Sequence, residues 1–593
     1  METLTGCGSY RVVVRRDPGE SRYAASRLSP ERRAADLARM HTEKFDVLVI
    51  GAGVTGVGAA LDAASRGLSV ALVEARDFAS GTSSRSSKLI HGGLRYLEQL
   101  EFPLVYEALR ERGLLLTRLA PHLVRPVPFL VPLTERVWQR AYYGAGVALY
   151  DTMASVLGYG RGIPWHKHLT RRAARRRFPS LREDQLIGAI KYYDGQVDDA
   201  RFVATMARTA ASLGAAVATS TRVVEVLRDA REVVGVRVRD MESGETFDVA
   251  ARTVIAATGV WSDDISELLG TAGRGLRVRA SKGIHLVVPR AAISGDDGLI
   301  LRTEKSVLFV IPWGGHWIIG TTDTDWQLDR AHPAASGRDI AYLLDHVNAV
   351  LDRPIRLSDI EGVYAGLRPL LSGESDETSK LSREHAVVEP MLGLMLVAGG
   401  KYTTYRVMAA DVVDKAASRL PGTPPSRTDD LPLLGADGFE QMWSNRADLA
   451  RRHGVPVGVL EHLLERYGSL SLDVLGLTAD YPGPVEGAPE YLAAEVAYAA
   501  LAEGALHLDD VLTRRTRISI ETVHRGVESA PHVAQIMASV LGWSPEKLTN
   551  EITHYVARVE AERESQRMPD DQTADAARLG APDVRGYAPE PAR

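Results

Sequence analysis

The fold of this chain is decided by the stretch Phe45-Asp46-Val47-Leu48-Val49-Ile50-Gly51-Ala52-Gly53-Val54-Thr55-Gly56. Its first half, residues 45–50, is apolar enough to predict a buried β-strand. Small residues at 57–65 then predict a helix, and residues 68–73 predict a second strand. Strand, glycine-rich turn, helix and strand in this order are typical of a dinucleotide-binding unit.

Each glycine of the turn has its own physical task in such a unit. Gly51 permits the tight turn, Gly53 lets the backbone approach a pyrophosphate, and Gly56 lets the helix pack on its strand. Glu74 ends the second strand, where a carboxylate can accept hydrogen bonds from ribose hydroxyls. The glycines alone could serve only close packing, so the prediction depends on the strands, the helix and Glu74 together. It does not decide between NAD and FAD.

Composition sets the wider limits. At 593 residues the chain is too long for one hydrophobic core. A net charge of -5 gives no indication of nucleic-acid binding. The one cysteine, Cys7, excludes a disulfide framework and any cysteine-based metal site, so no metal site is expected. No run approaches the roughly 20 apolar residues of a membrane-spanning helix.

Composition also divides the chain. Residues 1–44 are charged and read as an N-terminal extension, and 45–420 carry the dinucleotide-binding strands interleaved with a second set of strands. A proline-rich linker follows at 421–436, and a helical domain at 437–565. Residues 566–593 are rich in Pro, Asp and Ala, which predicts a disordered tail. Within these regions we expect strands at 233–238, 246–249, 253–257, 283–289, 307–311, 317–319 and 394–398, and helices at 439–453, 457–466, 493–503 and 531–540.

A run of small hydroxyl residues follows Glu74, from Ser80 to Lys88. Its side chains and backbone amides could wrap the phosphates and ribityl chain of a cofactor. A flexible polar loop is an equally good interpretation of the composition alone.

Ordered motifs along most of the chain carry a stronger signal. The sequence resembles FAD-dependent glycerol-3-phosphate dehydrogenases over roughly residues 44 to 563. The motifs that carry the resemblance are Ser80-Gly81-Thr82-Ser83-Ser84-Arg85-Ser86-Ser87-Lys88-Leu89-Ile90-His91-Gly92-Gly93-Leu94-Arg95-Tyr96-Leu97-Glu98, Val197-Asp198-Asp199-Ala200-Arg201, Ala257-Thr258-Gly259-Val260-Trp261, Lys282-Gly283-Ile284-His285, Ile319-Gly320-Thr321-Thr322-Asp323, Gly366-Leu367-Arg368-Pro369-Leu370, Gly399-Gly400-Lys401-Tyr402-Thr403-Thr404-Tyr405-Arg406 and Asp510-Val511-Leu512-Thr513-Arg514-Arg515-Thr516-Arg517.

The resemblance implies an α/β (α+β) fold. A glutathione-reductase-like FAD-binding Rossmann domain would be interleaved with an antiparallel-sheet substrate domain, and an α-helical C-terminal domain would cap both. This explains why the cofactor strands lie so far apart in sequence, at 45–50, 253–257 and 394–398. It also implies non-covalent FAD, because Cys7 lies outside the fold.

The resemblance further implies the reaction. Hydride would pass from C2 of sn-glycerol 3-phosphate to FAD, giving dihydroxyacetone phosphate, and the electrons would go on to a membrane quinone. The main alternative is a glycerol-3-phosphate oxidase, which reduces oxygen to hydrogen peroxide. Two others are an amine or amino-acid oxidase, whose substrate has no phosphate, and a flavoprotein that has lost catalysis.

By resemblance, the catalytic residues are His285, Arg368 and Lys401, with His285 as the preferred general base. Without the resemblance, His285 reads better as a strand histidine satisfied by backbone, and it could also only orient the substrate. Guanidinium groups suit bidentate contact with phosphate. The expected substrate-binding residues are Arg95, Tyr96, Thr321 and Arg383.

The expected cofactor-binding residues extend from the glycine turn to the flavin ring. Gly92 is included because a glycine there would allow close backbone approach to the ring. The full set is Gly51, Gly53, Gly56, Glu74, Ser83, Ser84, Ser87, Lys88, His91, Gly92, Thr258, Gly259, Gly399 and Gly400.

Use of a quinone would place the chain in the cytoplasm, peripheral on the inner face of the cell membrane. The basic stretch 171–178 could meet anionic headgroups, with Trp138, Tyr142, Tyr143 and Tyr150 as interfacial aromatics. A solvated basic helix face is the simpler reading of that stretch. The sequence does not set the oligomeric state; a homodimer is one assembly that it allows.

Overall fold

The protein is described from a computed structural model. It describes residues 23–93, 101–135, 138–156, 163–184, 186–268, 276–303, 307–372 and 384–587.

The first sheet joins strands that are far apart in sequence. β1 (Lys44–Ile50) lies at its centre, parallel to β2 (Val70–Val73) on one side and to β10 (Thr246–Ala256) on the other. β10 in turn pairs in parallel with β18 (Leu394–Gly399), and β2 with β7 (Ala216–Ala218). The predicted assembly of three distant segments into one parallel sheet is confirmed.

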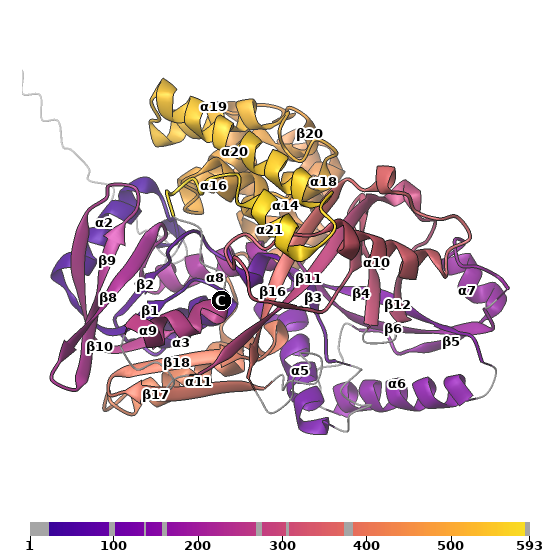
Figure 1. The fold of residues 1–593 in the computed structure, drawn as a ribbon, viewed down its shortest axis with the longest axis horizontal. Helices are drawn as coiled ribbons and strands as arrows, with labels where there is room; N and C mark the ends of the chain where they lie inside the picture. Colours follow the sequence, from indigo (N-terminus) through magenta and orange to yellow (C-terminus); the bar gives the residue numbers. More distant parts are fainter. Residues whose placement is uncertain are drawn as a thin grey trace, which may run out of the picture.

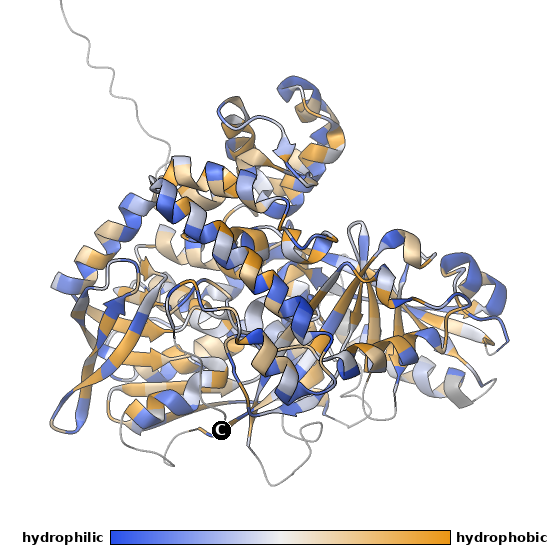
Figure 2. Ribbon diagram, turned by 45° about the horizontal axis from the view of Figure 1, so that its top comes forward, coloured by the Kyte–Doolittle hydropathy of each residue, from blue (hydrophilic) through white to orange (hydrophobic). Residues whose placement is uncertain are grey.

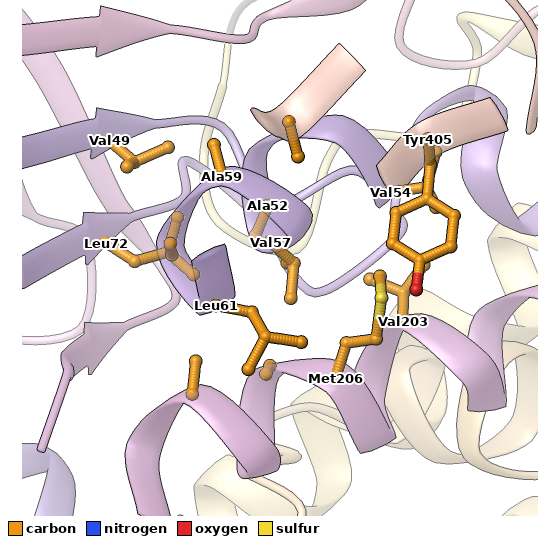
Figure 3. Packing of buried hydrophobic residues seen from close by; sticks show 14 of the residues in the cluster. Val49, Ala52, Val54, Val57, Ala59, Leu61, Leu72, Val203, Met206 and Tyr405 are labelled. Carbon is orange, nitrogen blue, oxygen red and sulfur yellow. The ribbon is translucent and has the colours of Figure 1, made fainter. Parts of the chain in front are cut away.

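Helices cover one face of this sheet. α3 (Val54–Ser65) packs between α8 (Asp199–Ser212) and α11 (Tyr405–Ala417). The buried side chains that join these helices to the sheet are apolar, as Figure 3 shows for Val57, Met206 and others. The other face packs against the hairpin strands β8 (Thr221–Asp229) and β9 (Glu232–Asp240), and the edge strand β17 (His385–Met391) completes the sheet.

The N-terminal extension contains a helix that belongs to this domain. α2 (Pro30–Thr42) begins at Ser29, whose hydroxyl accepts from the amide of Arg32. The Arg33 guanidinium reaches the carboxylate of Asp240 at 2.6 Å, which ties α2 to the end of β9. Part of residues 1–44 is therefore integral to the domain built on the first sheet.

The second sheet has ten strands and is mainly antiparallel. Its central strand β11 (Val278–Pro289) pairs antiparallel with β16 (Gly362–Leu371) and with β14 (His316–Gly320). One contact departs from the predicted antiparallel pattern, since β12 (Gly298–Arg302) and β4 (Val124–Leu133) run parallel. The remaining strands are β3 (Leu89–Ile90), β5 (Lys167–Thr170), β6 (Gly188–Val197), β13 (Val307–Trp313) and β15 (Thr324–Trp326), while α10 (Gly337–Asn348) packs on β11, β13 and β14.

A helical C-terminal region caps the molecule (Figure 1). The expected helix at 439–453 is two helices, α12 (Phe439–Ser444) and α13 (Arg446–His453), because Asn445 leaves the helical conformation between them. The other predicted helices correspond to α14 (Val457–Tyr467), α16 (Ala493–Ala502) and α19 (Ala530–Leu541), followed by α20 (Pro545–Ser565). Figure 2 shows hydrophobic strands beneath helices that mix hydrophilic and hydrophobic surface.

The prediction of a disordered tail is wrong for residues 566–587. They contain α21 (Asp571–Arg578), whose Ala574 is buried against Trp326 and Leu367 of the second sheet. The buried Lys282 ammonium of β11 donates to Asp571 at 2.5 Å. Composition misled the prediction because this segment is held largely by polar contacts. Residues 588–593 lie outside the described part of the chain.

Candidate active site

A cavity of about 970 Å³ is lined by residues of both sheets. Ile50, Val73 and Val397 line it from the carboxyl ends of parallel strands, where open α/β sheets bind their ligands. Gly283 and His285 line it from β11. The volume is large enough for a dinucleotide cofactor together with a small substrate.

The glycine turn is built as the sequence predicts. Gly51 has φ +99°, and a Cβ there would lie 2.8 Å from the carbonyl oxygen of Ala257. A Cβ on Gly56 would lie only 1.9 Å from the carbonyl oxygen of Gly51. Side chains are thus excluded where the turn crosses β10 and where α3 starts, which leaves the N-terminus of α3 facing the cavity.

Glu74 lines the cavity next to this turn. Its carboxylate accepts from the backbone amide of Ala52 at 2.7 Å and from that of Arg76 at 2.8 Å. Burial raises the pKa of Glu74, while those two amides act in the opposite direction. The carboxylate therefore ties β2 to the glycine turn and still has lone pairs available for a ribose.

The hydroxyl-rich run is an ordered wall of the cavity. It includes the 3₁₀ turn η1 (Thr82–Ser84), and Ser83 accepts from the amide of Val54 at the start of α3, at 2.9 Å. Ser80, Ser86 and Ser87 also line the cavity. The segment is therefore an ordered part of the cavity wall rather than a flexible loop.

Two predicted cofactor contacts in this run lie away from the cavity wall. Lys88 is fully buried and its ammonium pairs with Asp199 at 2.8 Å. Ser84 is also buried, and its carbonyl oxygen accepts from Lys88 at 3.2 Å and from Arg517 at 3.3 Å. Burial lowers the pKa of Lys88, and a buried ammonium needs such partners, so both residues serve the protein interior.

Gly92 is a third predicted cofactor residue that lies away from the cavity wall. A Cβ on Gly92 would lie 2.5 Å from the Tyr150 hydroxyl and 2.6 Å from Leu109. Its glycine therefore allows packing between protein segments, and it is not on the cavity wall. His91 does line the cavity, and its amide donates to the Thr403 hydroxyl at 3.1 Å.

The opposite end of the cavity is closed by the turn after β18. Gly399 and Gly400 have φ +82° and +76° and line the cavity together with Lys401. A Cβ on Gly400 would meet the Met408 sulfur at 2.4 Å. Two other predicted cofactor-binding residues, Thr258 and Gly259, also line the cavity.

His285 lies at this end, on β11. Its Nε2 is 2.9 Å from the Ser87 hydroxyl, and its ring stacks on Tyr364 with centroids 4.7 Å apart. Within the described chain its Nδ1 is buried without a hydrogen-bond partner. Burial holds the pKa of His285 well below its usual 6.5, and the nearby Arg368 and Lys88 lower it further. The imidazole is therefore neutral and able to accept a proton.

Arg368 extends into the cavity from β16. Its guanidinium donates to the Thr321 hydroxyl at 3.1 Å and to the Thr322 carbonyl oxygen at 3.2 Å. Thr321 itself lies behind Arg368 rather than on the cavity wall, so it positions the guanidinium. A Cβ on Gly283 would lie 2.5 Å from Arg368 and 2.4 Å from Thr321, which explains a glycine beside them.

Three predicted substrate contacts, Arg95, Tyr96 and Arg383, lie outside the described residues. The cavity wall also includes Arg222, Arg330 and Tyr587, which the motifs did not indicate. Arg330 binds the Asp264 carboxylate through two contacts of 3.0 Å. No local sequence signal marks these residues, because each reaches the cavity through tertiary structure.

The cavity fits FAD. The glycine turn and Glu74 supply a cradle for the adenosine and pyrophosphate, while Gly399 and Gly400 line the part of the cavity that remains for the flavin ring. The predicted cofactor-binding residues that line the cavity are Gly51, Gly53, Glu74, Ser83, Ser87, His91, Thr258, Gly259, Gly399 and Gly400.

Comparison with known families agrees with this geometry. Residues 46–406 match the family described as FAD dependent oxidoreductase. Residues 426–548 match the C-terminal domain of alpha-glycerophosphate oxidase.

Similar proteins extend over nearly the whole chain. Glycerol-3-phosphate dehydrogenase 2 of Mycobacterium tuberculosis is 57% identical over 577 residues, covering 97% of this chain and 98% of the relative. The mitochondrial glycerol-3-phosphate dehydrogenase of Bos taurus is 38% identical over 555 residues, covering 89% and 75%. The crystal structure of the Bacillus halodurans glycerol-3-phosphate dehydrogenase complexed with FAD superposes with a TM-score of 0.73 at 28% identity, covering 90% and 98%. The chain belongs to the FAD-dependent glycerol-3-phosphate dehydrogenase family.

Proposed function

We propose that this chain oxidises sn-glycerol 3-phosphate to dihydroxyacetone phosphate with FAD and passes the electrons to a membrane quinone. One observation carries the proposal: neutral, buried His285 and the Arg368 guanidinium extend from adjacent strands into one cavity. A proton acceptor and a fixed cation are what a phosphorylated alcohol requires.

In this proposal His285 removes the proton from the C2 hydroxyl. The Ser87 hydroxyl contacts Nε2, and the Tyr364 ring stacks on the imidazole. These two contacts hold the imidazole in one orientation before the substrate binds. FAD, when bound, accepts the hydride from C2. Lys401, at the Gly399–Gly400 turn, would stabilise negative charge at that end of the cavity.

Arg368 would hold the substrate phosphate. Its contacts with Thr321 and Thr322 fix the guanidinium plane, and the side chain keeps 25% exposure for a ligand. Arg95, Tyr96 and Arg383 are proposed to complete the phosphate site. An amine substrate, which has no phosphate, would make no use of Arg368.

Anaerobic addition of glycerol 3-phosphate to the holoenzyme tests the substrate. Bleaching of the oxidised-flavin band supports the proposal, and no bleaching contradicts it.

Reoxidation of the reduced enzyme then tests the electron acceptor. Fast reoxidation by a quinone analogue and slow reoxidation by air are expected; fast release of peroxide in air would make the protein an oxidase.

Membrane contact is the second part of the proposal. No helix within the described ranges is long and apolar enough to cross a membrane. Apolar side chains are nevertheless exposed on α5 (Phe102–Leu114) and α6 (Trp138–Val156), which lie on one side of the molecule (Figure 1). They include Phe102, Tyr106 and Leu149.

A basic helix follows these elements in sequence. α7 (Arg171–Arg177) carries five arginines, and Trp165 just before it is 56% exposed. Such a combination suits the interface of an anionic membrane. The prediction that Tyr150 is an interfacial aromatic is wrong, because this side chain is fully buried and its hydroxyl donates to Asp194 at 2.6 Å.

Flotation with vesicles containing anionic lipid tests this surface. Wild-type protein should float with the vesicles, and a Phe102→Ser, Leu149→Ser double variant should not. Equal flotation of both would exclude these side chains as the contact.

A homodimer is proposed from the resemblance alone, and light scattering of the purified protein tests it.

A further inference from the structure

The segment after α21 returns to the FAD-type domain and closes over it. The Asp583 carboxylate pairs with the Arg76 guanidinium at 3.3 Å and with the His332 ring at 3.1 Å. Two residues later, buried Arg585 donates to the Ser220 hydroxyl at 2.9 Å and pairs with Asp510 at 3.0 Å. The segment is thus fastened to three separate parts of the molecule.

Tyr587 extends from this segment to the cavity wall. Its hydroxyl donates to the Ala75 carbonyl oxygen at 2.5 Å. The guanidinium groups of Arg76 and Arg222 lie over its ring, 4.5 Å and 5.1 Å from the centroid. All of these residues line the cavity beside Glu74.

The position of Glu74 tells which part of the cofactor lies here. A carboxylate at the end of the second strand is the ribose acceptor of the adenosine half, so the base must lie just beyond it. Ala75 and Arg76 follow Glu74 directly, and Tyr587 contacts both. The tyrosine therefore borders the space where the adenine ring would be placed.

We propose that residues 581–587 form the outer wall of the adenosine subsite, with Tyr587 in contact with the adenosine of FAD. This segment lies beyond the residues that match the two families, 46–406 and 426–548. Aromatic rings and guanidinium groups both contact nucleobases, and here the Tyr587 ring and the Arg76 guanidinium lie against each other at the cavity wall. The salt bridges of Asp583 and Arg585 hold this wall in place.

The test compares FAD with FMN, which carries the flavin and one phosphate but no adenosine. Release of FAD from the holoenzyme is followed by flavin fluorescence, and the affinities for FAD and for FMN are both measured by titrating the flavin-free full chain. Tyr587→Ala should accelerate FAD release about 10-fold, the size expected for one base–aromatic contact. Its FMN affinity should equal that of the wild type.

Two controls sharpen the result. Tyr587→Phe keeps the ring and loses only the contact with Ala75, so its FAD release should change less than threefold, roughly the effect of one neutral hydrogen bond. Tyr106→Ala removes an exposed tyrosine that does not line the cavity, so its FAD release and FMN affinity should equal those of the wild type.

Each other outcome overturns the proposal. Unchanged FAD release in Tyr587→Ala would show that the ring does not contact the cofactor. An equal loss of FAD and FMN affinity would mean that the substitution loosens the protein generally. If Tyr587→Ala does not fold, Tyr587→Leu provides the same comparison, because it fills the space without an aromatic plane.

Discussion

The two ends of the cavity satisfy their polar groups in different ways. At the adenosine end, Glu74 and Ser83 already accept hydrogen bonds from backbone amides of the glycine turn and α3. At the substrate end, the Nδ1 atom of His285 is buried with no partner in the described structure. The carboxylate of Glu74 and the hydroxyl of Ser83 thus have protein partners without a ligand, whereas Nδ1 of His285 has none among the described residues.

This difference separates binding from chemistry. Groups paired within the protein hold a cofactor in one position, because little reorganisation accompanies binding. A buried polar atom without a partner costs stability and persists where a ligand uses it. The substrate end should therefore respond to substitution in turnover, and the adenosine end in cofactor affinity.

The largest effect is expected at His285. His285→Ala should lower kcat about 100-fold or more, as for the loss of a general base, with little change in FAD content. Stopped-flow flavin reduction measures this step directly. His453→Ala, an exposed histidine of the C-terminal domain, is the matched control. If His285→Ala changed mainly KM, the residue would only orient the substrate.

Arg368→Ala should act on binding at the same end. Loss of a charge-assisted contact with phosphate predicts a rise in KM of about 10- to 100-fold. Steady-state kinetics with glycerol 3-phosphate checks it. Arg279→Ala provides the control, because Arg279 lies on β11 and pairs with Asp325 away from the cavity. An unchanged KM would remove Arg368 from the phosphate site.

Glu74→Gln should affect cofactor affinity, because Glu74 lies at the adenosine end of the cavity. It removes the charge that the Ala52 and Arg76 amides stabilise and that the ribose would meet, so FAD should bind about 10-fold more weakly. In FAD-saturated enzyme kcat should be unchanged. Fluorescence titration gives the affinity, with the exposed Glu225→Gln as reference. A fall in kcat at saturating FAD would show that the two ends are not separable.

The smallest expected effect is a displacement of the pH profile. Because the pKa of His285 is below 6.5, its neutral form persists as pH falls through 6.5, and kcat/KM should decline only at lower pH. Arg368 contributes to this lowering, so Arg368→Gln should move the acid limb to higher pH. The measurement is kcat/KM as a function of pH for the wild type and for Arg368→Gln. An acid limb with a midpoint above pH 6.5 in the wild type would contradict a neutral, buried base.

The sequence was informative where the partners of a residue are local. Gly51, Gly56 and Glu74 could be assigned because the turn that they build closes within about 25 residues and follows general rules of strand–helix connection. The distant strands β10 and β18 could be placed only through the resemblance, since a buried strand carries no mark of its neighbour.

Other residues have partners that are distant in sequence. Lys88 and Gly92 are predicted cofactor contacts, but their environment is set by Asp199 and Tyr150, over 50 positions further along the chain. The prediction of a disordered tail at Tyr587 is wrong for the same reason. The composition of a segment shows how apolar it is. It does not show which carboxylates and carbonyl groups, distant in sequence, its side chains will contact in the folded protein.

The contact between Ala75 and Tyr587 joins positions 512 apart in the chain. We expect contacts between residues so far apart in sequence to form late in folding, because closing the long loop between them costs conformational entropy. Until then the adenosine end is an open cleft through which a cofactor can enter. Flavin loading should therefore accompany the last stage of folding, and docking of residues 581–587 would then slow its escape.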